Sequence, residues 1–188
     1  MEGSLMKANT ISYKTPKFFN TAGPVDPERH YCLDPLHRID LEENLQLIEQ
    51  QKYYVLHAPR QTGKTSSLLA LQAYLNNEGR YKCLYVNFEA GQASRDDSNQ
   101  GLESIFFEMA ERAEFSLGDS FFWDNFEKIK RFGGLSILKG ALSRWCDSSD
   151  KPTVLLIDEI DSLVGDVLIS VLRQIRSGYD RRPEHFPK

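Results

Sequence analysis

Three short apolar runs stand out along the chain, and each has the length of a buried β-strand. They are YYVLHA at 53–58, CLYVNF at 83–88 and TVLLID at 153–158. Continuous apolar runs of this length, bounded by turn residues, are typical of strands covered on both faces. The pattern therefore predicts a buried, mainly parallel sheet with three visible strands.

Apolar residues at helical spacing occupy much of the chain around these runs. Helices are predicted at 40–51, 64–76, 101–114, 119–131, 134–147 and 162–178. Asp40 and Glu43 have the spacing of a capping box at the first of them. The order strand, helix, strand between the first two apolar runs is the signature of a parallel βαβ unit. We therefore expect an α/β fold with helices on both faces of the sheet.

The remaining segments lack a regular period. Residues 1–17 are predicted to form a flexible lead-in, and the Pro-, Gly- and aromatic-rich stretch 18–35 an ordered but irregular arm. Residues 90–101 are polar and are predicted to form a loop. The length of 188 residues suits one core. We therefore expect a single domain over 18–188.

Composition places the chain among ordinary globular proteins, with 40% hydrophobic and 27% charged residues. No apolar run approaches the roughly 20 residues needed to cross a bilayer, and the N-terminus lacks a signal-peptide core. A cytoplasmic location without membrane contact is therefore expected. The net charge of −4 disfavours, without excluding, binding to nucleic acid. The three cysteines form no CxxC pair, so buried or half-buried thiols are expected rather than a zinc site or a disulfide framework.

Helices in the segment 101–132 are rich in phenylalanine. Packing of these helices against the sheet is the ordinary interpretation of such a segment, and a partner-binding face is the alternative.

Candidate chemistry begins with the stretch HAPRQTGKTSS at 57–67. It follows a predicted strand, opens a predicted helix and matches the phosphate-binding pattern G-x-x-x-x-G-K-[ST] except that Ala58 replaces the first glycine. The residues expected to surround the phosphates are Ala58, Pro59, Arg60, Gln61, Thr62, Gly63, Lys64, Thr65 and Ser66. Because Pro59 pushes the preceding residue toward extended geometry, we predict that Ala58 has a negative φ.

Each matching residue has a physical role in such a loop. Gly63 permits a close approach of the backbone to the phosphates, and the Lys64 charge spans the β- and γ-phosphates. The Thr65 hydroxyl is an expected ligand of Mg²⁺.

A second candidate constellation is the acidic pair at the end of the last apolar run. Asp158 lies where a parallel sheet presents its ligands, and can hold Mg²⁺ opposite Thr65. Glu159 can polarise a water molecule for attack on the γ-phosphate, which makes it the candidate catalytic base beside Lys64. A helix cap with a solvated acidic turn is the alternative for the sequence DEID considered alone.

Together, HAPRQTGKTS, VLLIDE and the arm FFNTAGPVDPERHY resemble the AAA-like or STAND-type P-loop ATPases from about Phe18 onward. The resemblance implies a three-layer α/β/α P-loop NTPase with ATP and Mg²⁺ as cofactors. It implies phosphate and metal roles for Lys64, Thr65 and Asp158, and the role of base for Glu159. In relatives the arm lies near the adenine, so either His30 or Tyr31 is a candidate contact for the adenine ring. A structural role in the arm is the alternative.

The resemblance also indicates a missing part. In such proteins a strand that follows the Asp-Glu motif lies between the loop strand and the Asp-Glu strand, and the residues after Asp158 contain no such run. Three of the expected five strands are visible. A chain truncated at its C-terminus is therefore expected, with slow or absent hydrolysis by these residues alone.

The favoured hypothesis is a regulatory ATPase module that binds ATP with Mg²⁺. Its nucleotide state would be read by a protein partner or attached effector domain through the segment between the second and third strands, and a homo-oligomer is compatible with this. ATP is preferred to GTP because no NKxD-like motif occurs. The alternatives are a catalytically idle nucleotide-binding scaffold and a DNA-linked ATPase of the initiator or transposition-helper type.

Overall fold

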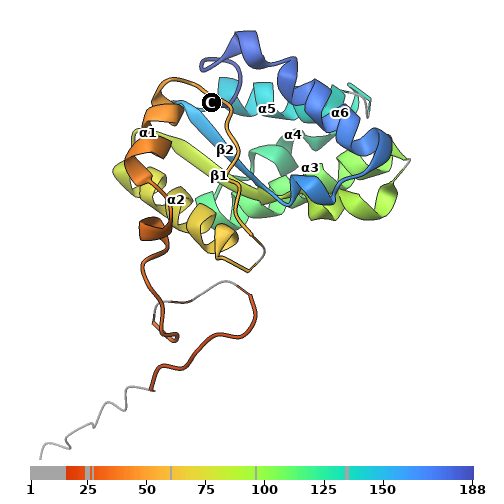
Figure 1. Ribbon diagram of the computed structural model, residues 1–188. Helices are drawn as coiled ribbons and strands as arrows, with labels where there is room; N and C mark the ends of the chain where they lie inside the picture. Colours follow the sequence, from red (N-terminus) through yellow and green to blue (C-terminus); the bar gives the residue numbers. More distant parts are fainter. Residues whose placement is uncertain (1–15, 24–25, 27, 60, 96, 134–135) are drawn as a thin grey trace, which may run out of the picture.

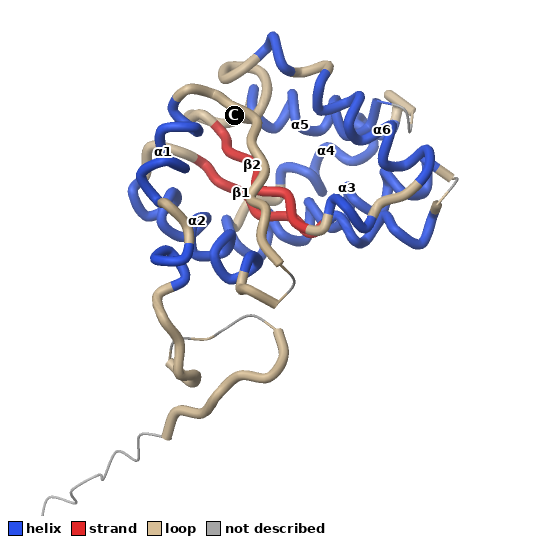
Figure 2. Tube along the Cα trace, viewed as in Figure 1, coloured by secondary structure: helices blue, strands red, loops and turns tan. Residues whose placement is uncertain are grey.

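The fold is built around a two-stranded parallel sheet with helices on both faces (Figure 1). The computed structural model describes residues 16–23, 26, 28–59, 61–95, 97–133 and 136–188. Residues 1–15 of the predicted lead-in lie outside this part of the chain. Figure 2 shows the two strands at the centre, with α1 and α2 on one side and α3 to α6 on the other. The α/β class predicted from the sequence is therefore confirmed.

Strands β1 (Lys82–Asn87) and β2 (Thr153–Asp158) pair in parallel, from Lys82 opposite Thr153 to Asn87 opposite Asp158. Both lie within one residue of the predicted positions. Successive side chains of a strand point to opposite faces. Each strand therefore contributes side chains to both apolar clusters, one on each side of the sheet.

The prediction of a third strand at 53–58 is wrong. This segment forms no strand, and its backbone makes no backbone–backbone hydrogen bond with the described residues. Tyr54 and Leu56 pack against the smaller apolar cluster, whereas Tyr53 and Val55 are 42% and 86% exposed. An apolar run can predict which side chains turn inward, but a strand also needs a hydrogen-bonding neighbour, and the described residues provide none here.

One face of the sheet is covered by α1 (Leu41–Glu49) and α2 (Lys64–Glu78). The predicted N-cap of α1 is confirmed, because the Asp40 side chain accepts a hydrogen bond from the amide of Glu43 at 2.9 Å. Helix α2 ends at Gly79, which has a φ of +83°. The first helical residue of α2 is Lys64, so this helix begins directly at the end of the candidate phosphate loop.

The amide side chains of α2 also occupy the outer edge of β1. Asn76 accepts from the Cys83 amide at 2.8 Å and donates to the Cys83 carbonyl at 2.9 Å. One helical turn earlier, the Gln72 side chain accepts from the Tyr85 amide at 2.5 Å. These bonds satisfy backbone groups that an edge strand would otherwise expose, and they fix α2 relative to β1.

The other face of the sheet is covered by a larger core. Its helices are α3 (Ser98–Leu117), α4 (Phe121–Lys130), α5 (Ile137–Asp147) and α6 (Gly165–Arg176). Phe106 and Phe122 are buried in it, which supports core packing as the main role of the aromatic segment. Among the described helices, none combines the length and the hydropathy that crossing a bilayer requires.

Two predictions on this side differ from the structure. The loop predicted at 90–101 is wrong in part, because a 3₁₀ helix (Phe88–Ser94) follows β1 directly and α3 begins at Ser98. The helix predicted from 162 begins at Gly165, after a separate 3₁₀ turn at Ile160–Ser162. Residues 134–135 of the predicted helix 134–147 lie outside the described residues.

Asp119 connects three elements of this larger core. Its carboxylate accepts hydrogen bonds from the Lys82 ammonium at 2.6 Å, the Trp145 indole at 2.8 Å and the Phe121 amide at 3.0 Å. Burial by itself would raise the pKa of Asp119, but these hydrogen bonds and the Lys82 charge outweigh burial and lower the pKa. Asp119 thereby joins the start of β1 to α4 and α5.

The cysteines only partly match their prediction. Cys83 on β1 and Cys146 on α5 are buried, whereas Cys32 in the arm is exposed. Burial raises the pKa of the Cys146 thiol to about 12, and burial also raises the pKa of Cys83. The expectation of a buried or half-buried thiol is therefore wrong for Cys32, which lies in an exposed run at 31–34.

Candidate functional site

The loop that precedes α2 turns sharply in its last residues. Gln61 and Gly63 have φ values of +59° and +87°. Ala58 is not among the described residues with positive φ, as predicted from the following proline. Arg60 lies outside the described residues. Two left-handed residues within three positions bend the backbone around the N-terminus of α2, the geometry from which successive N–H groups can face an anion.

Two hydrogen bonds within the loop hold this shape. The Thr62 hydroxyl donates to the Pro59 carbonyl at 2.7 Å, and the Lys64 ammonium donates to the Ala58 carbonyl at 3.1 Å. Gly63 is the N-cap of α2 and has no side chain with which to cap the first turn. The Lys64 charge therefore lies across the loop, at a helix end where amides and the helix dipole favour anions.

Arg38 supports the loop from outside and was missed by sequence reasoning. It ends the 3₁₀ helix Pro35–Arg38, and its guanidinium donates to the Thr62 carbonyl at 2.6 Å. A Cβ atom at Gly63 would lie only 3.0 Å from the same guanidinium nitrogen. Nothing in the local sequence indicates this contact, since the two residues are 24 positions apart.

The structure brings Thr65 and Asp158 into direct contact. The Thr65 hydroxyl donates to Oδ2 of Asp158 at 2.7 Å, and the Tyr85 hydroxyl donates to the same oxygen at 3.0 Å. The amide of Glu159 donates to Oδ1 at 3.1 Å. The Asp158 carboxylate, 5% exposed, is therefore fixed by three donors, and sequence reasoning did not find Tyr85 among them.

The Tyr85 phenol is suited to remain a donor. Burial raises its pKa, and the charge of Asp158 and their hydrogen bond raise the pKa further. The ring is 3% exposed, so the hydroxyl has little access to solvent.

The donor set around Asp158 fits a hard divalent cation. Within the described residues, no lysine, arginine or histidine forms an ion pair with this carboxylate, although buried carboxylates are usually paired with a positive charge. Hydroxyl and carboxylate oxygens are ligands that Mg²⁺ accepts, and Mg²⁺ typically takes few protein ligands and retains several waters.

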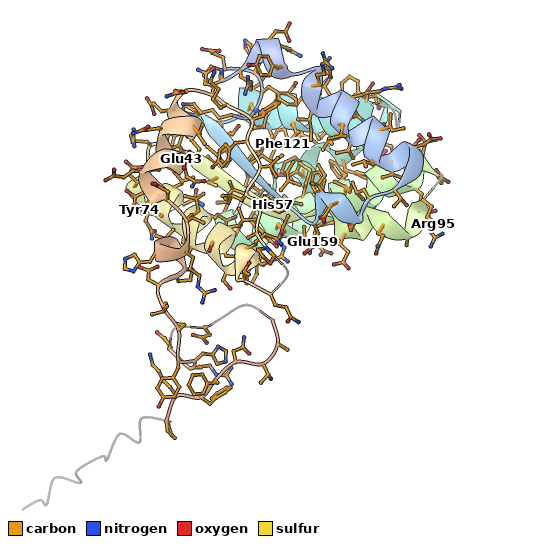
Figure 3. All side chains as sticks on the ribbon, in the orientation of Figure 1. Glu43, His57, Tyr74, Arg95, Phe121 and Glu159 are labelled. Atoms are coloured by element: carbon orange, nitrogen blue, oxygen red, sulfur yellow. The ribbon has the colours of Figure 1, made fainter. Side chains whose placement is uncertain are left out.

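Glu159 lies at the carboxyl end of the sheet and is exposed to solvent (Figure 3). Its backbone is left-handed, with a φ of +53° and a ψ of +32°, and Ser162 binds its carbonyl through both amide and hydroxyl, at 3.1 and 2.7 Å. A left-handed conformation costs an L-residue about 1 kcal/mol. This turn ends the extended backbone of β2 at Asp158.

The end of the arm reaches the start of α2, where the Pro35 carbonyl accepts a hydrogen bond from the Ser67 hydroxyl at 3.0 Å. Figure 1 shows residues 16–23 and 28–33 standing away from the sheet. The His30 ring packs edge to face on Phe18 at 4.8 Å and accepts from the Asp26 amide, and Tyr31 contacts Phe19 at 5.1 Å. These contacts favour the structural alternative for His30.

The sequence model of a family described as an AAA domain matches residues 47–185, which include the loop, the Asp-Glu pair and both strands. No curated protein and no solved structure matches the chain.

Proposed function

The chain belongs to the AAA-domain family of P-loop ATPases, and from that premise we propose that it binds ATP together with Mg²⁺ and hydrolyses the γ-phosphate. The observation that carries this proposal is the 2.7 Å hydrogen bond between Thr65 and Asp158. It joins the residue that follows the loop lysine to the first acid of the Asp-Glu pair. One triphosphate can therefore contact both motifs at the same time.

In this proposal the loop binds the phosphates. The backbone from Ala58 to Ser66 wraps around them, Gly63 allows close approach, and amides of the first turn of α2 donate to the phosphate oxygens. Lys64 exchanges its contact with the Ala58 carbonyl for the β- and γ-phosphates. Its charge then stabilises the negative charge of the transferring phosphoryl group.

Thr65 and Asp158 are proposed to hold Mg²⁺. The Thr65 hydroxyl hydrogen is already directed to Asp158, so its oxygen lone pairs are available to a cation. When bound, Mg²⁺ supplies charge neutralisation between the β- and γ-phosphates. Asp158 accepts the hydrogen bonds of Thr65 and Tyr85 and contributes negative charge at the site.

Glu159 is proposed as the general base. Its exposed carboxylate, held on a left-handed turn beyond β2, is accessible to the water that attacks the γ-phosphate. The backbone amide of Glu159 donates a hydrogen bond to Oδ1 of Asp158. This bond fixes the Asp158 carboxylate relative to the backbone that carries Glu159.

We further propose the complete family fold, a three-layer α/β/α arrangement with more strands than the described pair. The proposed role is that of a regulatory module in the cytoplasm, read by a protein partner, an attached effector domain or a further copy of the chain through the segment 88–152.

The test compares the chain with Glu159→Gln. We expect Mg²⁺-dependent ATP uptake by calorimetry in both proteins, and a fall in phosphate release of about 100-fold or more in the variant, the scale expected for loss of a general base. Equal phosphate release by both proteins would favour the idle scaffold. Absence of ATP uptake by the folded parent protein would refute the proposal altogether.

A further inference from the structure

Tyr85 contacts the proposed metal site from a strand to which the family motifs assign no role. Its hydroxyl lies 3.0 Å from Oδ2 of Asp158, the same oxygen that accepts from Thr65. Strand β1 thereby contributes directly to the position of a carboxylate on β2.

The register of the sheet explains how Tyr85 reaches this carboxylate. Tyr85 pairs with Leu156, and Asn87 pairs with Asp158. Tyr85 and Asp158 are therefore diagonal neighbours, and their side chains point to the same face because Leu156 and Asp158 are two positions apart. Neighbouring strands lie about 4.8 Å apart and rise about 3.3 Å per residue, so diagonal neighbours are about 8 Å apart at the backbone, a distance that a tyrosine can span and a serine or threonine cannot.

Tyr85 is itself held firmly in place. Gln72 on α2 accepts from its backbone amide, and the guanidinium of Arg112 on α3 lies 5.5 Å from its ring centre. With the ring buried, the hydroxyl has a narrow range of positions. A donor fixed in this way restricts the rotation of the carboxylate that it contacts.

We propose that Tyr85 is a positioning residue for Mg²⁺, acting through Asp158; this inference depends on the proposed function. By holding Oδ2 in place, Tyr85 keeps that oxygen as the acceptor for the Thr65 hydroxyl hydrogen. The Thr65 lone pairs then face the cation without a reorientation on binding. Partners that orient metal ligands in this manner typically contribute 10–100-fold to metal affinity.

The matched pair of variants is Tyr85→Phe and Tyr81→Phe. Each loses one phenolic hydroxyl that donates to a carboxylate, Asp158 in the first case and Glu49 in the second. Both tyrosines are at most 5% exposed. Tyr81→Phe therefore controls for the loss of a hydroxyl near the same cluster.

The experiment measures ATP binding as a function of Mg²⁺ concentration, and separately in EDTA. We expect Tyr85→Phe to raise the Mg²⁺ concentration for half-maximal effect about 10–100-fold, with ATP affinity in EDTA unchanged. Tyr81→Phe should alter neither quantity. If ATP binding by Tyr85→Phe depends on Mg²⁺ concentration as it does in the parent protein, the inference is overturned and the proposed function remains intact.

A second measurement requires no nucleotide. In urea unfolding of the metal-free protein, Tyr85→Phe and Asp158→Ala should shift the midpoint non-additively when combined, because each removes one partner of the same hydrogen bond. Additive shifts of the urea midpoint would show that the two side chains do not interact in the folded protein. If the parent protein shows no Mg²⁺-dependent ATP binding, the proposed function fails and this inference with it, whatever the outcome in urea.

Discussion

Thr65 and Asp158 share a 2.7 Å hydrogen bond although they are 93 positions apart in the sequence. Thr65 is the second residue of α2, and Asp158 is the last residue of β2. The bond therefore fixes the N-terminus of a helix against the carboxyl end of a strand, where P-loop proteins bind nucleotide and metal.

The Thr65 hydroxyl can be tested by a pair of substitutions. Thr65→Ala should reduce ATP affinity in Mg²⁺ at least about tenfold and leave the affinity in EDTA unchanged, because the hydroxyl is proposed to contact the metal and not the phosphates. Thr65→Ser keeps the hydroxyl and should behave like the parent. Calorimetric titration with ATP in both buffers measures the effect, and equal losses in Mg²⁺ and EDTA would assign Thr65 a structural role instead.

The support given by Arg38 to the phosphate loop leads to a second prediction. Arg38→Ala removes the donor to the Thr62 carbonyl and should weaken ATP binding about 3- to 10-fold, since a hydrogen bond contributes about 1 kcal/mol. Arg80→Ala is a suitable control, because Arg80 pairs with Glu78 and Glu49 on the surface. Fluorescence titration with an ATP analogue checks both variants. Unchanged affinity in Arg38→Ala would show that the loop keeps its shape without this contact.

Thiol accessibility should separate the cysteines. At about pH 8, near the thiol's ordinary pKa, one of the three thiols should react rapidly with an aromatic disulfide reagent, namely the exposed Cys32. Cys146, whose pKa is raised to about 12, and the buried Cys83 should react only on unfolding. Cys32→Ser should abolish the rapid phase, and rapid reaction of a second thiol would contradict the described core.

Asp119 should make the free energy of unfolding depend on pH in the acid range. Its pKa is lowered in the folded protein, so its contribution is fully present above the unfolded-state pKa of about 3.9 and is lost as the pH falls through the folded-state pKa. Asp119→Asn should therefore be less stable than the parent at pH 7, and the difference should shrink below about pH 4. Urea unfolding across this range measures it, with Glu111→Gln on the exposed side of α3 as the control. A difference that does not change with pH would contradict the prediction.

Some features could be predicted from local sequence because their causes are local. The Asp40 cap of α1 follows from the spacing of Asp40 and Glu43, and the end of β2 at Asp158 follows from the change from apolar to acidic residues. The negative φ of Ala58 follows from the proline after it. In each case the determining residues lie within a few positions of one another.

The features that could not be predicted depend on distant neighbours. The segment 53–58 has the composition of a strand, but strand formation requires a second backbone, which composition does not supply. Arg38 and Tyr85 reach the site only through tertiary packing and sheet register. An arginine before a helix and a tyrosine within a strand are common, so neither residue carries a signal of its own.

The amide side chains of Gln72 and Asn76 are hydrogen-bonded to backbone groups along the outer edge of β1. A second copy of the chain, or any extended peptide, cannot pair with β1 without first displacing both amides, so self-association through that edge is suppressed. Beside β2, the Lys188 amide donates to the Thr153 carbonyl at 2.9 Å, whereas no side-chain amide of a covering helix is bonded there among the described residues. Two residues one helical turn apart therefore bias any growth of the sheet toward the β2 side.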